Sequence, residues 1–197
     1  MSAMAELVLV QDDLTRRRVD VVVNAANRRM RGGGGVDGAI HRAGGPAVLA
    51  DCVARYPHGL ATGDAGWTTA GDLPAHWVVH TVGPNWNGGE RDPALLTSCY
   101  RRSLEVADEL GARSVAFPLV SAGIYGWPLA DAARLAVATL ATTPVLAVGR
   151  IEIVVLGDRE RDAVRAALDA LPPVGSSQAP AAPPREGATT RDEGTTP

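Results

Sequence analysis

Residues 19–45 read VDVVVNAANRRMRGGGGVDGAIHRAGG and carry the strongest structural signal in the sequence. The run Val19–Val23 is mostly apolar rather than strictly alternating, which is typical of a strand covered by helices on both faces. After the polar segment 24–27 and a loop, four consecutive glycines at 32–35 lead through Val36 and Asp37 into an expected helix. Glycines cost backbone entropy, so this run indicates backbone angles or a close approach that side chains would forbid. We therefore expect a ligand to lie against this backbone.

Main-chain amides before a helix N-terminus form a favourable phosphate site, through hydrogen bonding and the helix dipole. A flexible hairpin-like loop is the alternative interpretation of the glycines. A second loop of small residues follows the apolar run Ser114–Phe117 and reads PLVSAGIYGWP over residues 118–128. It can offer further amides, and Tyr125 provides a flat face for a sugar. Two phosphate-binding loops together favour a diphosphate ligand.

Short β-branched runs alternate with helix-period segments, which predicts an α/β fold with helices on both faces of a sheet. The candidate strands are 7–10, 19–23, 67–69, 77–81, 114–117 and 151–156. The candidate helices are 38–43, 46–56, 93–110, 128–141 and 159–171. Ligands in such folds bind just beyond the carboxyl ends of the strands. Both the glycine loop, residues 32–35, and the second loop, residues 118–128, are expected there.

The length of 197 residues suits one domain, expected at 1–171, followed by a tail at 172–197. The tail contains six prolines and almost no aliphatic residues, so we expect it to be disordered. A net charge of -3 gives no overall electrostatic reason to expect a nucleic-acid partner. All 19 basic residues are arginine, which excludes a lysine-containing phosphate loop and any lysyl covalent intermediate.

No apolar run approaches the roughly 20 residues that span a bilayer, and residues 1–10 lack the basic start of a secretory signal. We therefore expect a cytoplasmic protein with no membrane partner. We also expect it to be a monomer. Cys52 and Cys99 show no metal or disulfide spacing, so both are expected to be reduced and structural. His58, His76 and His80 show no ligand spacing either. We expect no metal and no cofactor.

The motifs NAAN, GGGGVDGAIHRAGG and SAGIYGWP occur in this order, and GDAGWTTAGDLPAHWVVHTVGPNW lies between them at 63–86. Together they resemble the macrodomain family, in particular its MacroD-type branch of O-acetyl-ADP-ribose deacetylases and mono-ADP-ribosyl hydrolases. The resemblance covers residues 7–171. It implies a three-layer α/β/α fold with a central mixed sheet, which binds ADP-ribose and hydrolyses the bond between its distal ribose and an acyl group.

The resemblance also implies which residues bind ADP-ribose. Asp13 would accept the adenine amino group and Leu14 would offer a backbone contact, although capping of the next turn is an alternative role for Asp13. The first glycine loop would pack against the distal ribose and its phosphate, and the second would wrap the diphosphate from the other side. The implied set is Asp13, Leu14, Ala26, Asn27, Gly34, Gly35, Val36, Asp37, Ser121, Ala122, Gly123, Ile124 and Tyr125.

Two positions depart from the family pattern. Asp12 stands where the family has glycine, so the turn after the first strand is expected to differ. The segment Leu156-Gly157-Asp158 occupies the region where the family often has an aromatic residue beside adenine. Stacking on adenine is therefore lost or supplied from elsewhere in the chain.

The implied catalytic residues are Asn27, Asp37 and His41. Hydrolysis of an acyl ester needs a positioned water, a group that orients or deprotonates it, and donors that hold the sugar hydroxyls. Asp37 can orient the water and accept its proton, and Asn27 can hydrogen-bond a ribose hydroxyl. His41 follows Asp37 by one helical turn and shares its helix face. A purely capping role for Asp37 and a structural role for His41 are the alternatives.

The implied substrates are O-acetyl-ADP-ribose and proteins mono-ADP-ribosylated on acidic side chains. A non-catalytic ADP-ribose reader is one alternative, but readers often lack the acid that this chain keeps at Asp37. A dinucleotide-dependent oxidoreductase is another, because Gly33, Gly35 and Gly38 fit the spacing G-x-G-x-x-G. The long connection from strand to glycines argues against it, as does His58 in place of an acid about 20 residues after Gly38.

Overall fold

The computed structural model describes residues 5–172. The strands are β1 (Glu6–Gln11), β2 (Val21–Ala26), β3 (Ala65–Thr69), β4 (Trp77–Val82), β5 (Ser114–Phe117) and β6 (Arg150–Val155). The helices are α1 (Gly35–Gly44), α2 (Pro46–Arg55), α3 (Pro93–Glu109), α4 (Leu129–Thr142) and α5 (Asp158–Asp169), with a short 3₁₀ helix η1 (Leu14–Arg16). Within residues 5–172, every helix is too short or too polar to span a bilayer. The expected disordered tail, 172–197, lies outside the described residues apart from Pro172.

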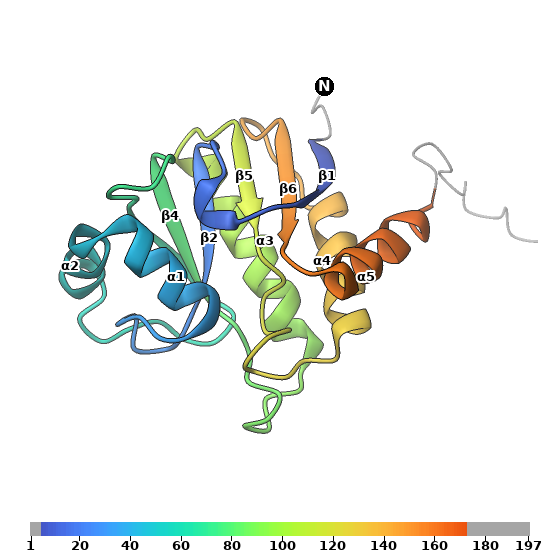
Figure 1. Ribbon diagram of the computed structural model, residues 1–197, viewed down its shortest axis with the longest axis horizontal. Coiled ribbons are helices and arrows are strands. Elements are labelled where there is room, and N and C mark those ends of the chain that lie inside the picture. Colours follow the sequence, from blue (N-terminus) through green and yellow to red (C-terminus); the bar gives the residue numbers. More distant parts are fainter. Residues whose placement is uncertain (1–4, 173–197) are drawn as a thin grey trace, which may run out of the picture.

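The strands form one mixed sheet, as expected, and their order in it is β1-β6-β5-β2-β4-β3. Neighbouring strands are parallel except β3 and β4, which are antiparallel at one edge. Val22 of β2 pairs with Val78 of β4 and with Ala116 of β5, which places β2 in the interior of the sheet. Since β2 and β5 are parallel, the loops that follow them emerge at the same edge of the sheet (Figure 1).

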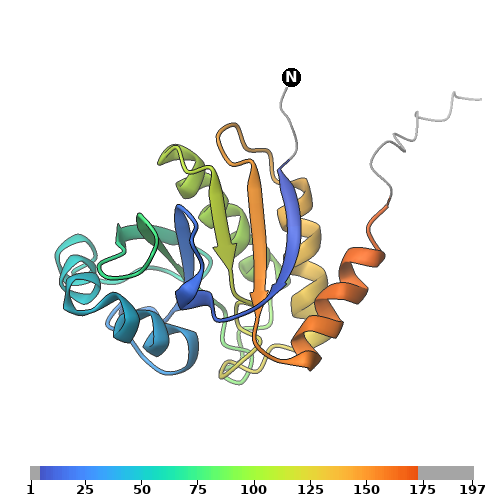
Figure 2. The ribbon, with the colours of Figure 1, turned by 45° about the horizontal axis from the view of Figure 1, so that its top comes forward.

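Helices cover both faces of the sheet, which confirms the three-layer α/β/α fold (Figure 1, Figure 2). α1 and α2 lie on one face, and α3, α4 and α5 lie on the other. Alternate residues of β2 therefore face different helices. Val21 and Val23 pack into the core beneath α3 and α4, whereas Val22 packs beneath α1. Because both faces are buried, the β2 sequence is a continuous apolar run.

Most elements lie within two residues of their expected bounds, and the two larger differences both fall between residues 19 and 45. β2 runs over Val21–Ala26 rather than 19–23, because Asn24 continues the ladder opposite His80. α1 begins at Gly35 rather than at residue 38, because the amide of Gly38 already donates to the carbonyl of Gly34 at 3.3 Å. Asp37 consequently lies inside the first turn of α1.

Candidate functional site

A buried carboxylate lies in the first turn of α1, beneath the glycine loop. Asp37 is only 5% exposed. Its Oδ1 accepts a hydrogen bond from Asn24 Nδ2 at 2.7 Å and lies 3.3 Å from His41 Nε2. Its Oδ2 lies 3.4 Å from Asn27 Nδ2 and faces Gly33, where an added Cβ would come within 3.0 Å of it. The structure therefore brings together the three residues that the sequence predicts as catalytic, and it adds Asn24.

Asn27 shapes the glycine loop with both ends of its amide. Its Nδ2 donates to the carbonyl of Gly32 at 2.8 Å, and its Oδ1 accepts from the amide of Arg29 at 3.0 Å. The loop that results needs glycine, since φ is +79° at Gly32 and +57° at Gly35, in the left-handed region that side chains disfavour. Asn27 thus holds the loop over Asp37.

The N-terminus of α1 keeps its main-chain donors available. Gly34 precedes the helix, and within residues 5–172 no side chain caps this end. The first amides of an α-helix have no partner inside the helix, and the helix dipole makes this end favourable for an anion. The glycine loop and α1 together therefore present the amides that a phosphate site requires.

The second loop, residues 118–128, is folded into a compact turn beside the glycine loop. The carbonyl of Ser121 accepts from the amide of Trp127 at 2.9 Å, and Ser121 has a φ of +65°. The Oγ of Ser121 is buried without a hydrogen-bond partner among the described residues. An added Cβ on Gly34 would lie 3.0 Å from Ile124 Cδ1. The two loops therefore meet at Gly34 and Ile124, which is the adjacency that the diphosphate hypothesis requires.

Tyr125 lies close to the buried acid. Burial raises the pKa of the Tyr125 hydroxyl, and the negative charges of Asp37 and Glu90 raise that pKa further. The carbonyl of Tyr125 accepts from the amide of Asn87 at 3.1 Å. Glu90 in turn forms an ion pair with Arg28, next to Asn27. The segment after β4 thus connects the two loops on one side of the site.

Asp13 and Leu14 lie after β1, at η1. Asp13 Oδ1 accepts from the amide of Thr15 at 2.9 Å and from its hydroxyl at 2.7 Å, so the capping role that the sequence left open is present. Leu14 is buried. Asp12, which replaces the family's glycine, accepts from the amide of Asp13 and pairs with Arg17 at 2.8 Å. At this end of the site Leu156 is 75% exposed, so it offers an apolar surface in place of an aromatic ring.

A cavity of about 460 Å³ borders the outer side of the glycine loop. It is lined by Arg31, Gly32, Gly33, Gly38, His41, Arg42, Gly45, Pro46 and Leu49.

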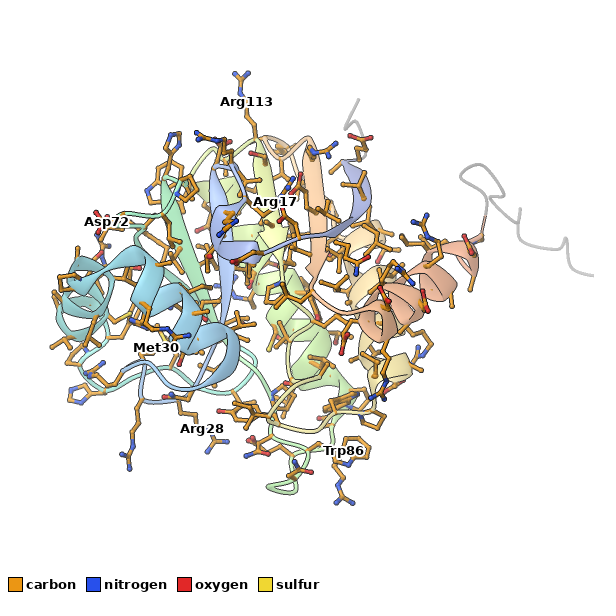
Figure 3. The ribbon with its side chains drawn as sticks, viewed as in Figure 1. Arg17, Arg28, Met30, Asp72, Trp86 and Arg113 are labelled. Carbon is orange, nitrogen blue, oxygen red and sulfur yellow. The ribbon has the colours of Figure 1, made fainter. Side chains whose placement is uncertain are left out.

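Arg28 and Trp86 lie at the end of the sheet where the glycine loop and the second loop emerge, and Arg113 lies at the opposite end (Figure 3). The Arg31 guanidinium is occupied by the main-chain carbonyls of residues 29, 30, 56 and 57. Its role is therefore to hold the loop.

Cys52 and His80, which show no ligand spacing along the chain, lie together with His41 in the fold. The ligand atoms of His41, Cys52 and His80 all lie within 4.8 Å of one another. These residues come from α1, α2 and β4, so their spacing along the chain carries no signal. Sequence reasoning also missed Asn24, which is fully buried with its Nδ2 3.0 Å from His80 Nδ1. The signal that could have found Asn24 and His80 is a polar residue at an inward position of an apolar strand.

The chain is similar to known proteins over most of its length. The family model described as Macro domain matches residues 23–136. A macro domain-containing protein of Streptomyces coelicolor is 55% identical over 169 residues, which cover 84% of this chain and 99% of that protein. An O-acetyl-ADP-ribose deacetylase of Cronobacter turicensis is 55% identical over 135 residues, which cover 67% of this chain and 77% of that protein.

Solved structures give the same result for the fold. The Trypanosoma brucei macrodomain in complex with ADP-ribose has a TM-score of 0.77 and 36% identity, covering 82% of this chain and 68% of that one. The Oceanobacillus iheyensis macrodomain with ADP has a TM-score of 0.76 and 36% identity, covering 82% of this chain and 88% of that one. With its motifs, its six-stranded mixed sheet and its relatives in agreement, the chain belongs to the macro domain family.

Proposed function

We propose that the protein binds ADP-ribose and hydrolyses acyl esters of its distal ribose. The substrates would be O-acetyl-ADP-ribose and proteins mono-ADP-ribosylated on acidic side chains. Two findings support the ligand: the glycine loop and the second loop meet at Gly34 and Ile124, and a related macrodomain is solved with ADP-ribose. A deacetylase among the relatives supports the reaction.

The diphosphate would lie between the N-terminus of α1 and the second loop. Amides of Gly35 and Val36 would donate from one side, and amides of residues 121–125 from the other. The buried Ser121 Oγ, unpaired within the described chain, is a further donor. Adenosine would extend toward Asp13 and Leu14, and the distal ribose toward Ala26, Asn27 and Asp37.

In the hydrolytic step Asp37 would act on water. Its Oδ1 is held between Asn24 and His41, which leaves Oδ2 facing the glycine loop. Oδ2 takes a proton from a water whose oxygen attacks the acyl carbon. The ester bond between that carbon and the ribose oxygen then breaks, and the proton is returned to the ribose oxygen. General acid–base help of this kind contributes about 10²–10⁴-fold in rate.

The observation that carries the proposal is the convergence of three side chains on one buried carboxylate. Asn24, Asn27 and His41 each place a nitrogen within 3.4 Å of an oxygen of Asp37. A carboxylate that only capped α1 would need none of them.

The test is an incubation with three matched substrates: O-acetyl-ADP-ribose, a protein mono-ADP-ribosylated on glutamate, and one modified on arginine. Mass spectrometry measures the ADP-ribose released. We expect release from the two esters and none from the N-glycosidic arginine linkage. The control variant is Asp108→Ala, which removes an acceptor for the amides of residues 146–148 before β6 and should keep full turnover. Saturable binding of ADP-ribose without release from either ester would leave a reader and overturn the hydrolase.

A further inference from the structure

A chain of buried hydrogen bonds runs across three neighbouring strands to Asp37. Thr68 of β3, His80 of β4 and Asn24 of β2 are all fully buried. Thr68 Oγ1 lies 2.8 Å from His80 Nε2, and His80 Nδ1 lies 3.0 Å from Asn24 Nδ2. The same Asn24 nitrogen lies 2.7 Å from Asp37 Oδ1. These hydrogen bonds thus connect an edge strand of the sheet to the proposed catalytic acid.

The direction of every proton in this chain follows from its two ends. A carboxylate oxygen only accepts, so Asn24 must turn its amide nitrogen, and not its oxygen, toward Asp37. The second N–H of that nitrogen points to His80 Nδ1, which therefore accepts. Burial lowers the pKa of His80 to about 3, so its ring is neutral and carries its single proton on Nε2. Nε2 donates to Thr68 Oγ1, whose own proton goes to the carbonyl of Thr69 at 3.0 Å.

Building on the proposed function, we propose that His80 is a positioning residue for the hydrolysis. By accepting one N–H of Asn24, the ring keeps the amide from flipping and holds the other N–H on Asp37 Oδ1. With Oδ1 fixed between Asn24 and His41, Oδ2 is directed to the side of Gly33, where the water and the ribose would lie. His80 itself does not touch the substrate.

A metal ion held by His41, Cys52 and His80 is the competing interpretation of the same atoms. Two features favour the hydrogen-bond chain. Both nitrogens of His80 already have partners, Asn24 and Thr68, so a metal would have to displace one of them. Burial, together with the charges of Asp37 and Asp51, raises the pKa of Cys52 to about 11, so the thiol keeps its proton at neutral pH. A protonated thiol is a poor metal ligand.

The test compares two replacements of His80 with a control in the same cluster. His80→Asn keeps an acceptor near the place of Nδ1, whereas His80→Leu fills the space without one. We expect kcat for the glutamate-linked substrate to fall at least tenfold in His80→Leu, with ADP-ribose affinity within threefold of wild type. His80→Asn should recover most of that loss. Equal losses in both variants would reduce His80 to a packing role and overturn the proposal.

Cys52→Ala is the matched control, because Cys52 Sγ also contacts His80 Nε2, at 3.6 Å, but lies outside the link from His80 through Asn24 to Asp37. It should leave kcat unchanged, and elemental analysis of the wild-type protein should find no stoichiometric transition metal. Stoichiometric metal that Cys52→Ala removes, with loss of turnover, would overturn the proposal in favour of a metal site.

A nuclear magnetic resonance measurement on the wild-type protein keeps the proposal testable even if the variants misfold. Long-range ¹H–¹⁵N spectra should show a neutral His80 ring between pH 5 and 7, as the low pKa requires, with its proton on Nε2, as donation from Asn24 to Nδ1 requires. An Nδ1–H tautomer or a protonated ring would be incompatible with the hydrogen bond from Asn24 to His80 and would overturn the proposal. This result does not depend on turnover, so it separates failure of the inference from failure of the proposed function.

Discussion

His80 should make the stability of the protein depend on pH in a way that can be calculated. Burial lowers the pKa of His80 from 6.5 to about 3. Between these values the unfolded chain binds a proton at His80 that the folded protein does not bind. The free energy of unfolding therefore falls as pH decreases below 6.5 and continues to fall toward pH 3. pH 4.5 lies about two units below the unfolded-state pKa of His80. Over this interval the free energy of unfolding falls by roughly 3 kcal/mol relative to its value at pH 7.5.

Urea unfolding at pH 7.5 and pH 4.5 measures this loss. Protonation of carboxylates such as Glu152 also destabilises the protein in acid. Burial opposes the charged form of Glu152, but hydrogen bonds to Arg17 and Arg150 lower its pKa overall. The informative quantity is therefore the difference between wild type and His80→Asn, in which those carboxylates are unchanged. We expect the variant to lose about 2–3 kcal/mol less than wild type over this range. Equal pH dependence in the two proteins would mean that His80 is not held neutral in the folded protein.

Three further predictions concern the acid, the glycine loop and the thiols. Asp37→Ala should lower turnover of the glutamate-linked substrate at least about a hundredfold while ADP-ribose affinity stays within about tenfold; equal activity would remove Asp37 from the mechanism. Gly35→Val forces a branched side chain into a φ of +57° and should weaken ADP-ribose binding at least about tenfold by calorimetry, whereas Gly111→Val, with a φ of +73° and nothing within 4 Å, should not. Cys52 and Cys99, with pKa values raised by burial to about 11, should resist iodoacetamide at pH 8 in the folded protein; rapid alkylation would contradict their burial.

The fold could be predicted from the sequence wherever local patterns decide it. The strand at 114–117 and the start of α3 at Pro93 were predicted to the residue, because an apolar run and an Asp-Pro boundary mark them. β2 was predicted too short because an asparagine is unfavourable in a strand unless it finds buried partners, and Asn24 finds Asp37 and His80. α1 was predicted to start late because glycines are poor helix formers.

The site could be predicted only in part. Asn27, Asp37 and His41 lie within 15 consecutive residues of one motif, so their proximity follows from the local structure. The contact between Asn24 and His80 depends on which strands are neighbours, because 56 residues separate the two along the chain. No local pattern contains that information. The adenine role of Asp13 remains a prediction, since the structure shows its capping bonds to Thr15.

The proposed function depends on main-chain amides from the glycine loop and from the second loop binding one diphosphate. Isothermal titration calorimetry of the folded protein with free ADP-ribose measures this binding. We expect saturable heat with one site per chain, and a clear loss of heat when adenosine, which lacks the diphosphate, replaces ADP-ribose. Absence of saturation with ADP-ribose, in protein whose circular dichroism confirms an α/β fold, would rule out this diphosphate site.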